Sequence, residues 1–360
     1  MKKKINKRKI SFAEAINESL FQSMNKNKNL LLMGLGITDP KAVFGTTKGL
    51  LKKFGKSRVI ETPTSENAIT GIAIGSAINN NPVVLTHQRV EFALLSMDQI
   101  INQAAKWHFM TAKKKSVPIV IRLVIGRGWG QGPTHSQNLQ AWFAHIPGLK
   151  VVCPTTPNDA RDLLYEAIFD PDPVVFLEHR WLHNSIGTVK SNITSNQIGK
   201  ARTVNVGKDV TVVASSYMVI EALRAIKELE KNNINAELID LRSYKPIDWK
   251  TISRSLKKTG RLLVVDSGFS TCSIASEIIA KMATEHFHDL KTAPIKLAMP
   301  DVPEPTGYSL TKNFHISKTN IVIKVLEMLK IKSDIKNIKQ NLELKNKFHD
   351  QPDFGLIEPF

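Results

Sequence analysis

The sequence predicts an α/β protein built from two doubly wound domains. Short apolar runs alternate with amphipathic, helix-length segments along the 360 residues. The alternation is interrupted once, by a polar stretch rich in Asn, Ser, Thr and Gly. Parallel strands joined by helical crossovers produce such a rhythm. We therefore expect a first domain at 8–185, a linker at 186–205, a second domain at 206–332 and a basic polar tail at 333–360.

Each element is assigned from its hydrophobic period. A helix is expected at 11–25, because Phe12, Ile16, Leu20 and Met24 recur at helical spacing. In the rest of the first domain we expect strands at 30–34, before 61, and at 83–85, 117–125, 149–153 and 173–177, with helices around 51–54, after 65, and at 93–110, 138–143 and 157–168. In the second domain we expect strands at 210–214, 236–241, 262–265 and 295–298, with helices at 218–231, 249–256 and 272–283.

One junction between a strand and a helix carries an acid, Glu66. The preceding TPTS at 62–65 is typical of a helix start, so Glu66 falls in the first turn. Gly71 and Gly75 leave one face of this helix without side chains. Glu66 is then either a solvated acid that complements the helix dipole or a carboxyl group held in the ligand cleft at a strand end.

A glycine-rich loop, GRGWGQGP at 126–133, follows another apolar strand. It lacks the Lys-Ser or Lys-Thr pair of a phosphate-binding P-loop, and its spacing does not fit a dinucleotide fingerprint. Its glycines permit close backbone approach to a ligand. His135 follows the loop directly, and is either a surface or capping residue or a catalytic one.

The formal net charge of +18 leaves two classes of partner open. Lysines gather at both ends of the chain and at 113–115 without interleaved aromatic residues, and no nucleic-acid-binding motif is present. Nucleic-acid binding is one alternative, and an acidic protein partner is another. Cys153 and Cys272 are expected to be buried free thiols of a cytoplasmic protein, since no secretory signal or membrane-spanning run is found.

Seven motifs, in order along residues 10 to 330, resemble the beta subunit of thiamin-diphosphate-dependent 2-oxoacid dehydrogenases, the first component of the pyruvate dehydrogenase type. They are ETPTSE at 61–66, MDQIINQAAK at 97–106, THSQ at 134–137, AHIPGLKVV at 144–152, DPVVFLE at 172–178, IDLRSYKPID at 239–248 and TGRLLVV at 259–265. The resemblance implies a transketolase-like pyrimidine-binding domain followed by a transketolase carboxyl-terminal domain.

The resemblance also implies half of an active site. In that family, an alpha subunit carries the Gly-Asp-Gly signature that holds magnesium and the cofactor's diphosphate, and two alpha chains pair with two beta chains. This sequence contains no Gly-Asp-Gly. We therefore expect a heterotetramer with such an alpha subunit, and a lipoyl acyltransferase as a further partner.

Three residues receive roles from the resemblance. Glu66 matches the carboxyl group that hydrogen-bonds the cofactor's pyrimidine, which needs a dry site. Phe92 stands where the family stacks an aromatic ring on the pyrimidine, although an ordinary core phenylalanine is the alternative. His135 matches a histidine near the reacting carbon and the incoming lipoyl group. Asp170 and Asp172 fall where relatives often build a structural potassium site, or else simply make a turn.

The sequence departs from the family pattern at GLGI (34–37), at THQRVE (86–91) and in the glycine-rich loop. His87, Arg89, Arg127 and Trp129 could form a pocket for an anionic or phosphorylated substrate, or the loop could repack against the alpha subunit. We expect oxidative decarboxylation of a 2-oxoacid, pyruvate by default, with acyl transfer to a lipoyl carrier. The alternative reaction is that of a split transketolase or a deoxyxylulose-phosphate-synthase-like enzyme, which transfers a carbanion to an aldehyde.

Overall fold

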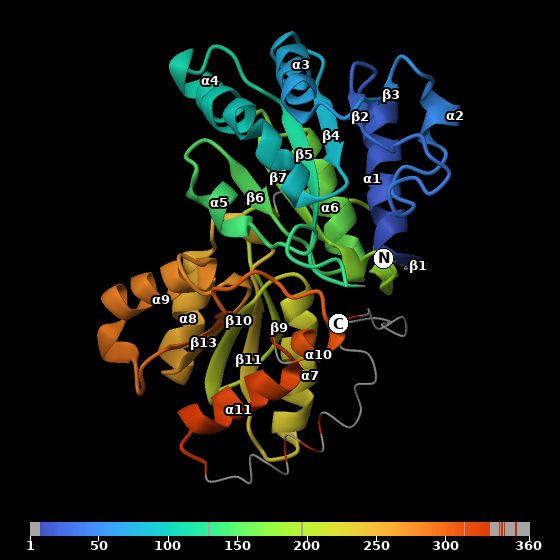
Figure 1. Ribbon diagram of the computed structural model, residues 1–360. Helices are drawn as coiled ribbons and strands as arrows, with labels where there is room; N and C mark the ends of the chain where they lie inside the picture. Colours follow the sequence, from blue (N-terminus) through green and yellow to red (C-terminus); the bar gives the residue numbers. More distant parts are fainter. Residues whose placement is uncertain are drawn as a thin grey trace, which may run out of the picture.

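The computed structural model describes residues 8–128, 130–195, 197–312 and 314–331, together with positions 338, 340, 342 and 350 (Figure 1). Trp129 and nearly all of the expected tail therefore lie outside the described residues. Two α/β units stand one above the other in Figure 1, each with a sheet inside and helices around it. The predicted fold class is confirmed.

The first sheet has seven strands, and six of them are parallel. Across the sheet they are β12 (Ser243–Lys245), β6 (Lys150–Val152), β7 (Val174–His179), β5 (Ile119–Ile125), β4 (Val83–His87), β2 (Leu31–Gly34) and β3 (Val59–Glu61). Only β12 runs antiparallel to its neighbour. In the register, Gly34 at the end of β2 lies opposite Glu61 on one side and Thr86 on the other. The carboxyl ends of these strands therefore meet at one edge of the sheet.

Hydrophobic side chains cover both faces of this sheet. Leu32 packs into a core with Phe12 and Ile16, whereas its neighbour Met33 points to the other core with Ile69. Successive residues of a strand point to opposite faces, so an unbroken apolar strand indicates burial on both sides. The helices that cover the faces are α1 (Phe12–Lys26), α2 (Leu50–Phe54), α3 (Glu66–Ile78), α4 (Ala105–Met110), α5 (Gln140–His145) and α6 (Pro157–Ile168).

The helix expected at 93–110 is not one regular helix, and this prediction was wrong in detail. The segment consists of a 3-10 helix η1 (Val90–Ser96), a π-helix η2 (Gln99–Ala104) and then α4. A hydrophobic period of 3.6 residues indicates which face of a helix is buried. It does not show whether the backbone hydrogen bonds follow the 3-10, α or π pattern. Such π segments are frequent at functional sites, and this one follows directly after the turn that carries Phe92.

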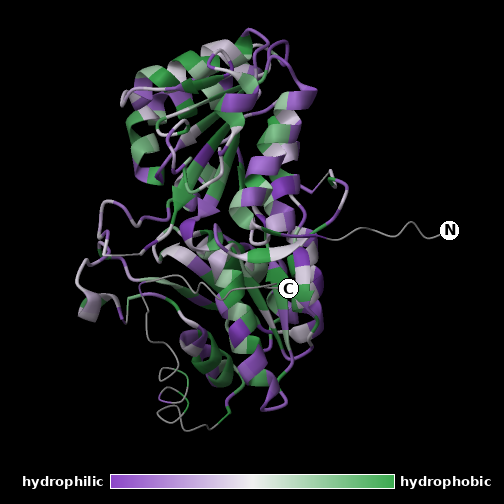
Figure 2. Ribbon diagram, turned by 90° about the vertical axis from the view of Figure 1, so that its right-hand side faces the viewer, coloured by the Kyte–Doolittle hydropathy of each residue, from purple (hydrophilic) through white to green (hydrophobic). Residues whose placement is uncertain are grey.

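The second sheet has five strands. They are β14 (Ile295–Met299), β13 (Leu262–Phe269), β10 (Val210–Ala214), β11 (Ala236–Asp240) and the antiparallel edge strand β9 (Arg202–Asn205). The accompanying helices are α7 (Tyr217–Glu230), α8 (Trp249–Thr259), η4 (Phe287–Asp289), α9 (Ile274–Glu285), α10 (Tyr308–Thr311) and α11 (Lys318–Met328). Figure 2 shows mainly hydrophobic strands inside helices of mixed hydropathy.

The segment between the two sheets is more structured than the expected linker at 186–205. A 3-10 helix, η3 (Arg180–Leu182), precedes this segment. The segment begins with β8 (Ile186–Val189), which pairs with β1 (Arg8–Ser11), and it ends with β9. The chain also crosses back, because β12 from the second half completes the first sheet. The expected domain limits stay predictions.

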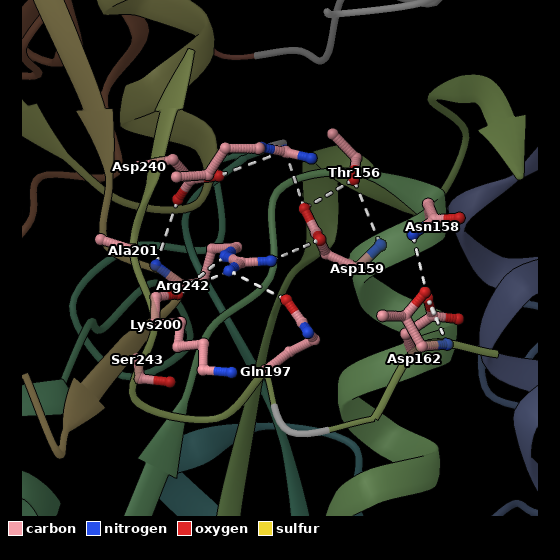
Figure 3. Close-up of polar contacts among 12 residues, drawn as sticks. Thr156, Asn158, Asp159, Asp162, Gln197, Lys200, Ala201, Asp240, Arg242 and Ser243 are labelled. Atoms are coloured by element: carbon pink, nitrogen blue, oxygen red, sulfur yellow. Dashed lines mark hydrogen bonds and ion pairs between the residues drawn. The ribbon is translucent and has the colours of Figure 1, made fainter. Parts of the chain in front are cut away.

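Charged side chains join the two halves (Figure 3). The carboxylate of Asp159 on α6 accepts a hydrogen bond of 3.1 Å from Nη1 of Arg242, which follows β11. Nη2 of Arg242 donates to the carbonyl of Lys200 at 2.7 Å. Arg202 on β9 forms a second ion pair with Asp159, at 2.8 Å. Buried charges need such partners, so this network fixes how the halves pack.

The two cysteines differ in environment. Cys153 is buried, and burial raises the pKa of its thiol to about 12, whereas Cys272 is exposed. The prediction of two buried thiols was therefore wrong for Cys272, which stands in the turn just before α9. Within the described residues, no helix has both the length and the apolar character needed to cross a bilayer. The expected compartment stays a prediction.

A buried ion pair inside the first sheet is expected to dominate its sensitivity to mutation. Nε of Arg122 on β5 donates to Glu178 on β7 at 2.6 Å, and both side chains are fully buried. Removing one partner from such a pair costs about 3–5 kcal/mol, because the other charge is left uncompensated. We predict a loss of this size for Glu178→Ala in the free energy of unfolding, measured by chemical denaturation.

Two variants control this measurement. The double replacement Arg122→Met with Glu178→Leu should recover most of the loss, since it removes both charges. Glu327→Gln in the exposed pair with Lys324 should change the stability by less than about 1 kcal/mol. A Glu178→Ala protein as stable as the exposed-pair variant would contradict the prediction.

Candidate active site

Glu66 is the first residue of α3 and lies at the carboxyl-end edge of the first sheet. The side chain is half-buried and lines a small cavity of about 20 Å³. The cavity is mostly apolar on the side of Ile69 and Leu85 and polar at Thr62 and His87. Glu66 thus stands beside a cavity at a strand end, and its role as a ligand-binding carboxyl group stays a prediction.

Phe92 connects Glu66 with His135. Its ring lines the same cavity as Glu66, from the turn η1. The ring of His135 meets it edge-on, with 5.5 Å between the ring centroids. Nδ1 of His135 is buried and has no hydrogen-bond partner among the described residues. The sequence-predicted carboxyl group, aromatic ring and histidine therefore form one cluster.

His87 also faces the cavity of Glu66. It is 6 % exposed, and its Nε2 has no hydrogen-bond partner in the described part of the chain. Burial lowers the pKa of its imidazole from 6.5 to about 4. At neutral pH this side chain is thus an uncharged group with an unused polar atom at the cavity wall.

The two arginines of the expected anion pocket have partners of their own. Arg89 is buried and donates through Nη2 to Oε1 of Gln131 in the glycine-rich loop. Arg127 stacks on Trp181, with its guanidinium carbon 4.6 Å from the ring centroid, and burial lowers its pKa to about 10. Arg127 lines a separate cavity with Tyr217. Trp129 lies outside the described residues, and the pocket of His87, Arg89, Arg127 and Trp129 stays a prediction.

Two glycines of the loop are needed for contacts within the protein itself. Gly126 has a φ of +94°, and a Cβ there would overlap the ring of His179. Gly132 has a φ of +64°, and a Cβ there would overlap the hydroxyl of Thr306 in the second half of the chain. These positions require glycine because the loop packs tightly on the protein itself.

Asp170 and Asp172 already have cationic partners. Nζ of Lys150 lies 2.6 Å from Asp170 and 3.1 Å from Asp172. Nδ1 of His108 lies 2.5 Å from Asp172. This arrangement does not favour a further cation between the carboxylates, and the potassium site stays a prediction.

Two residues at the site were missed from the sequence. Arg180, directly after β7, donates to the same Oε1 of Gln131 as Arg89 does. Glu91 accepts a hydrogen bond of 2.8 Å from the backbone of Gln137, which holds the segment after His135. The signal for Arg180 was its place at the end of a buried strand, where ligands of parallel sheets gather.

The fold and this cluster define a transketolase-like chain with a pyrimidine-binding first domain, and comparisons with known proteins agree. The family "Transketolase, pyrimidine binding domain" matches residues 8–184, and "Transketolase, C-terminal domain" matches residues 199–321. A solved structure titled "Split gene transketolase, inactive beta4 tetramer" has a TM-score of 0.71 over 90% of this chain and 99% of that chain. At 20% identity, it shows the fold alone.

Curated relatives are more specific. The chain is 40% identical to the beta subunit of acetoin:2,6-dichlorophenolindophenol oxidoreductase from Cupriavidus necator, over 84% of this chain and 92% of that protein. It is also 40% identical to the mitochondrial pyruvate dehydrogenase E1 component subunit beta-2 of Oryza sativa, over 85% of this chain and 82% of that protein. The beta subunit of the Bacillus subtilis acetoin:2,6-dichlorophenolindophenol oxidoreductase is 38% identical, over 89% of this chain and 98% of that protein. The chain belongs to this family of E1 beta subunits.

The cofactor of this family is thiamin diphosphate. The lining of the Glu66 cavity fits its pyrimidine end in chemistry, whereas the cavity volume of about 20 Å³ holds about one water molecule. The half-buried carboxylate of Glu66, the ring of Phe92 and the imidazole of His87, whose Nε2 has no hydrogen-bond partner among the described residues, line a cavity with apolar and polar walls. A flat ring with polar nitrogens needs such a lining. These residues would hold the pyrimidine end of the cofactor. The predicted magnesium and diphosphate sites, on the partner, stay predictions.

The buried His87 predicts a pH dependence of stability. Its pKa is depressed in the folded chain, so its contribution is fully present above pH 6.5 and is lost as the pH falls from 6.5 toward 4. A depression of this size corresponds to about 3 kcal/mol. Between pH 7 and pH 4, the wild-type chain should lose about 3 kcal/mol more unfolding free energy than His87→Gln. Chemical denaturation across this range measures the difference.

The exposed His288 provides the matched control. His288→Gln makes the same replacement at the protein surface and should keep the wild-type pH profile. If His87→Gln and the wild-type chain lose equal stability on acidification, His87 is not held neutral by burial.

Proposed function

We propose that this chain is the beta subunit of a thiamin-diphosphate-dependent 2-oxoacid dehydrogenase, with pyruvate as the default substrate. The reaction is oxidative decarboxylation with transfer of the acyl group to a lipoyl carrier. The cluster of Glu66, Phe92 and His135 at the strand ends carries the proposal. Relatives named as pyruvate and acetoin enzyme subunits support it.

Each residue of the cluster has a distinct task in this proposal. The chemistry that thiamin diphosphate supplies when bound is a carbon nucleophile and an electron sink for decarboxylation. Glu66 holds a proton shared with a pyrimidine ring nitrogen, and the apolar walls of the cavity exclude water from that contact. Phe92 would pack against the pyrimidine ring. His135 gives and takes protons beside the reacting atoms, through Nδ1, which has no hydrogen-bond partner within the described residues.

An alpha subunit completes the site in this proposal. The sequence lacks the Gly-Asp-Gly signature, so the diphosphate and magnesium are assigned to the partner. Several large apolar side chains on α3, η1, α4 and α5 are exposed. They are Ile72, Leu95, Phe109, Met110 and Trp142. Exposed apolar groups on neighbouring elements are typical of a subunit interface. We expect two alpha and two beta chains, and a lipoyl acyltransferase that accepts the acyl group.

The role of Glu66 predicts a separation of binding from turnover. Glu66→Gln keeps the shape of the side chain but removes the carboxylate. In the complex reconstituted with the alpha subunit, we expect turnover to fall by about 10²–10⁴-fold. Cofactor affinity, measured by calorimetry, should change far less. Release of carbon dioxide with a lipoyl domain, compared with aldehyde acceptors, reports the reaction type in the same preparation.

Glu277 offers the control, because it is likewise a first-turn glutamate but lies on α9 of the second half. Glu277→Gln should keep wild-type turnover. Near-normal turnover in Glu66→Gln would remove Glu66 from the mechanism. Transfer to aldehydes without use of the lipoyl domain would replace the dehydrogenase with a transketolase-like reaction.

A further inference from the structure

Three side chains with metal-binding atoms meet where the second half of the chain contacts the glycine-rich loop. Glu304 lies in the loop between β14 and α10, and His315 lies in the turn between α10 and α11. Asp350 comes from the carboxyl-terminal part of the sequence. One ligand atom of each, a carboxylate oxygen or an imidazole nitrogen, lies within 4.8 Å of the other two. Among the described residues, this is the only such group of three.

The donor atoms of this group are buried and incompletely used. The side chains of His315 and Glu304 are 6 % and 4 % exposed, and Nε2 of His315 lies 3.1 Å from Oε1 of Glu304. This contact lacks the geometry of a hydrogen bond, and neither Nε2 of His315 nor Oε2 of Glu304 has a hydrogen-bond partner among the described residues. Buried polar atoms normally have partners, so these two atoms indicate the place of a ligand.

The charges around Glu304 also favour a cation. Burial, together with the charges of Asp350 and Glu91, raises the pKa of its carboxyl group to about 8, although Arg127 and the hydroxyl of Ser136 act in the opposite direction. Arg127 acts on this carboxyl group through its charge alone, since the two form no ion pair within the described residues. A cation between the two carboxylates would offset their repulsion at much shorter range.

We infer that Glu304, His315 and Asp350 bind a divalent transition-metal ion, with zinc as the best match. One imidazole nitrogen and two carboxylate oxygens suit zinc, whereas magnesium and calcium prefer oxygen ligands alone. Zinc holds such donors at about 2.0–2.2 Å, so shifts of about 1 Å bring the three atoms into range. A cavity of about 20 Å³ beside His315 has room for about one water molecule, which can fill a fourth position.

The ion ties Asp350 to the glycine-rich loop. Oδ2 of Asp350 accepts a hydrogen bond of 2.7 Å from the backbone amide of Gly130, and its carbonyl oxygen would lie 3.5 Å from a Cβ at Gly128. The same loop leads into His135. A metal that fixes the carboxylate of Asp350 therefore also holds the loop that precedes the candidate catalytic histidine. Such a site goes beyond the proposed reaction and does not depend on it.

Zinc titration of the full chain tests the site. In calorimetry, the metal-stripped chain should bind one Zn²⁺ per chain with a Kd below about 10 μM, weaker than structural sites with four protein ligands. All proteins carry Cys272→Ser, because an exposed thiol also binds zinc. His315→Gln and Glu304→Gln, which keep the approximate size of each side chain, should each weaken binding more than about 100-fold, since loss of outer partners alone costs about 10–100-fold.

His286 provides the matched control. Its Nδ1 lies 2.9 Å from Oδ2 of Asp289, but no third donor completes the set in the described part of the chain. His286→Gln should therefore bind zinc as the wild type does. The inference is overturned if the wild-type chain has no zinc site with a Kd below about 10 μM, or if His315→Gln and Glu304→Gln bind zinc as tightly as His286→Gln does.

Hydrogen exchange, followed by mass spectrometry, tests the tie to the loop. Zinc should slow exchange in the segment 126–133 about 10-fold, because the amide of Gly130 then donates to a fixed carboxylate. Asp350→Asn keeps an acceptor for this amide but loses the charge, and should abolish both zinc binding and the slowing. Zinc binding that leaves exchange in this segment unchanged would overturn the tie. These measurements need neither cofactor nor partner, so their failure is distinct from a failure of the Glu66 test.

Discussion

Parallel pairing of β3, β2, β4, β5 and β7 is the constraint on which the site depends. It aligns the carboxyl ends of all five strands, so residues far apart in the sequence emerge at one edge. Glu66 follows β3, Phe92 follows β4, His135 follows β5 and Arg180 follows β7. Each belongs to the segment that follows its strand, where the backbone has left the hydrogen-bonded sheet. A register shift of one residue would exchange the two buried faces of a strand and disperse this set.

Buried polar and charged groups fall into two kinds in this protein. Inside the first sheet, Glu178 accepts from Arg122 and lies 3.1 Å from Nε2 of His183. Burial alone would raise the pKa of Glu178, but the charge of Arg122 and the hydrogen bonds from His183 and Arg122 lower it overall. At the strand ends, by contrast, Arg89 and His87 have buried polar atoms without hydrogen-bond partners among the described residues. Satisfied charges hold the fold, and unsatisfied ones mark the places where a ligand is expected.

Much of the fold followed from local pattern, because hydrophobic period and turn chemistry are encoded in short windows. The same windows located Glu66 and His135, since both stand beside strand ends with recognisable helix-start or glycine-rich chemistry. The crossing of β12 into the first sheet could not be read this way, because pairing partners are set by tertiary contacts. The convergence of Arg180 and Arg89 on Gln131 has the same origin, because three separate segments meet there and no local pattern shows that they do.

The central claim is a direct contact between Glu66 and a ring nitrogen of the pyrimidine. Calorimetry on the reconstituted complex can compare thiamin diphosphate with an analogue that has CH in place of that nitrogen. If the contact exists, the wild-type complex should bind the analogue at least about 10-fold more weakly, as expected for a lost hydrogen bond to a charged group. In a Glu66→Ala complex the two ligands should then bind equally well. If the wild-type and Glu66→Ala complexes prefer thiamin diphosphate over the analogue by the same factor, the account is contradicted.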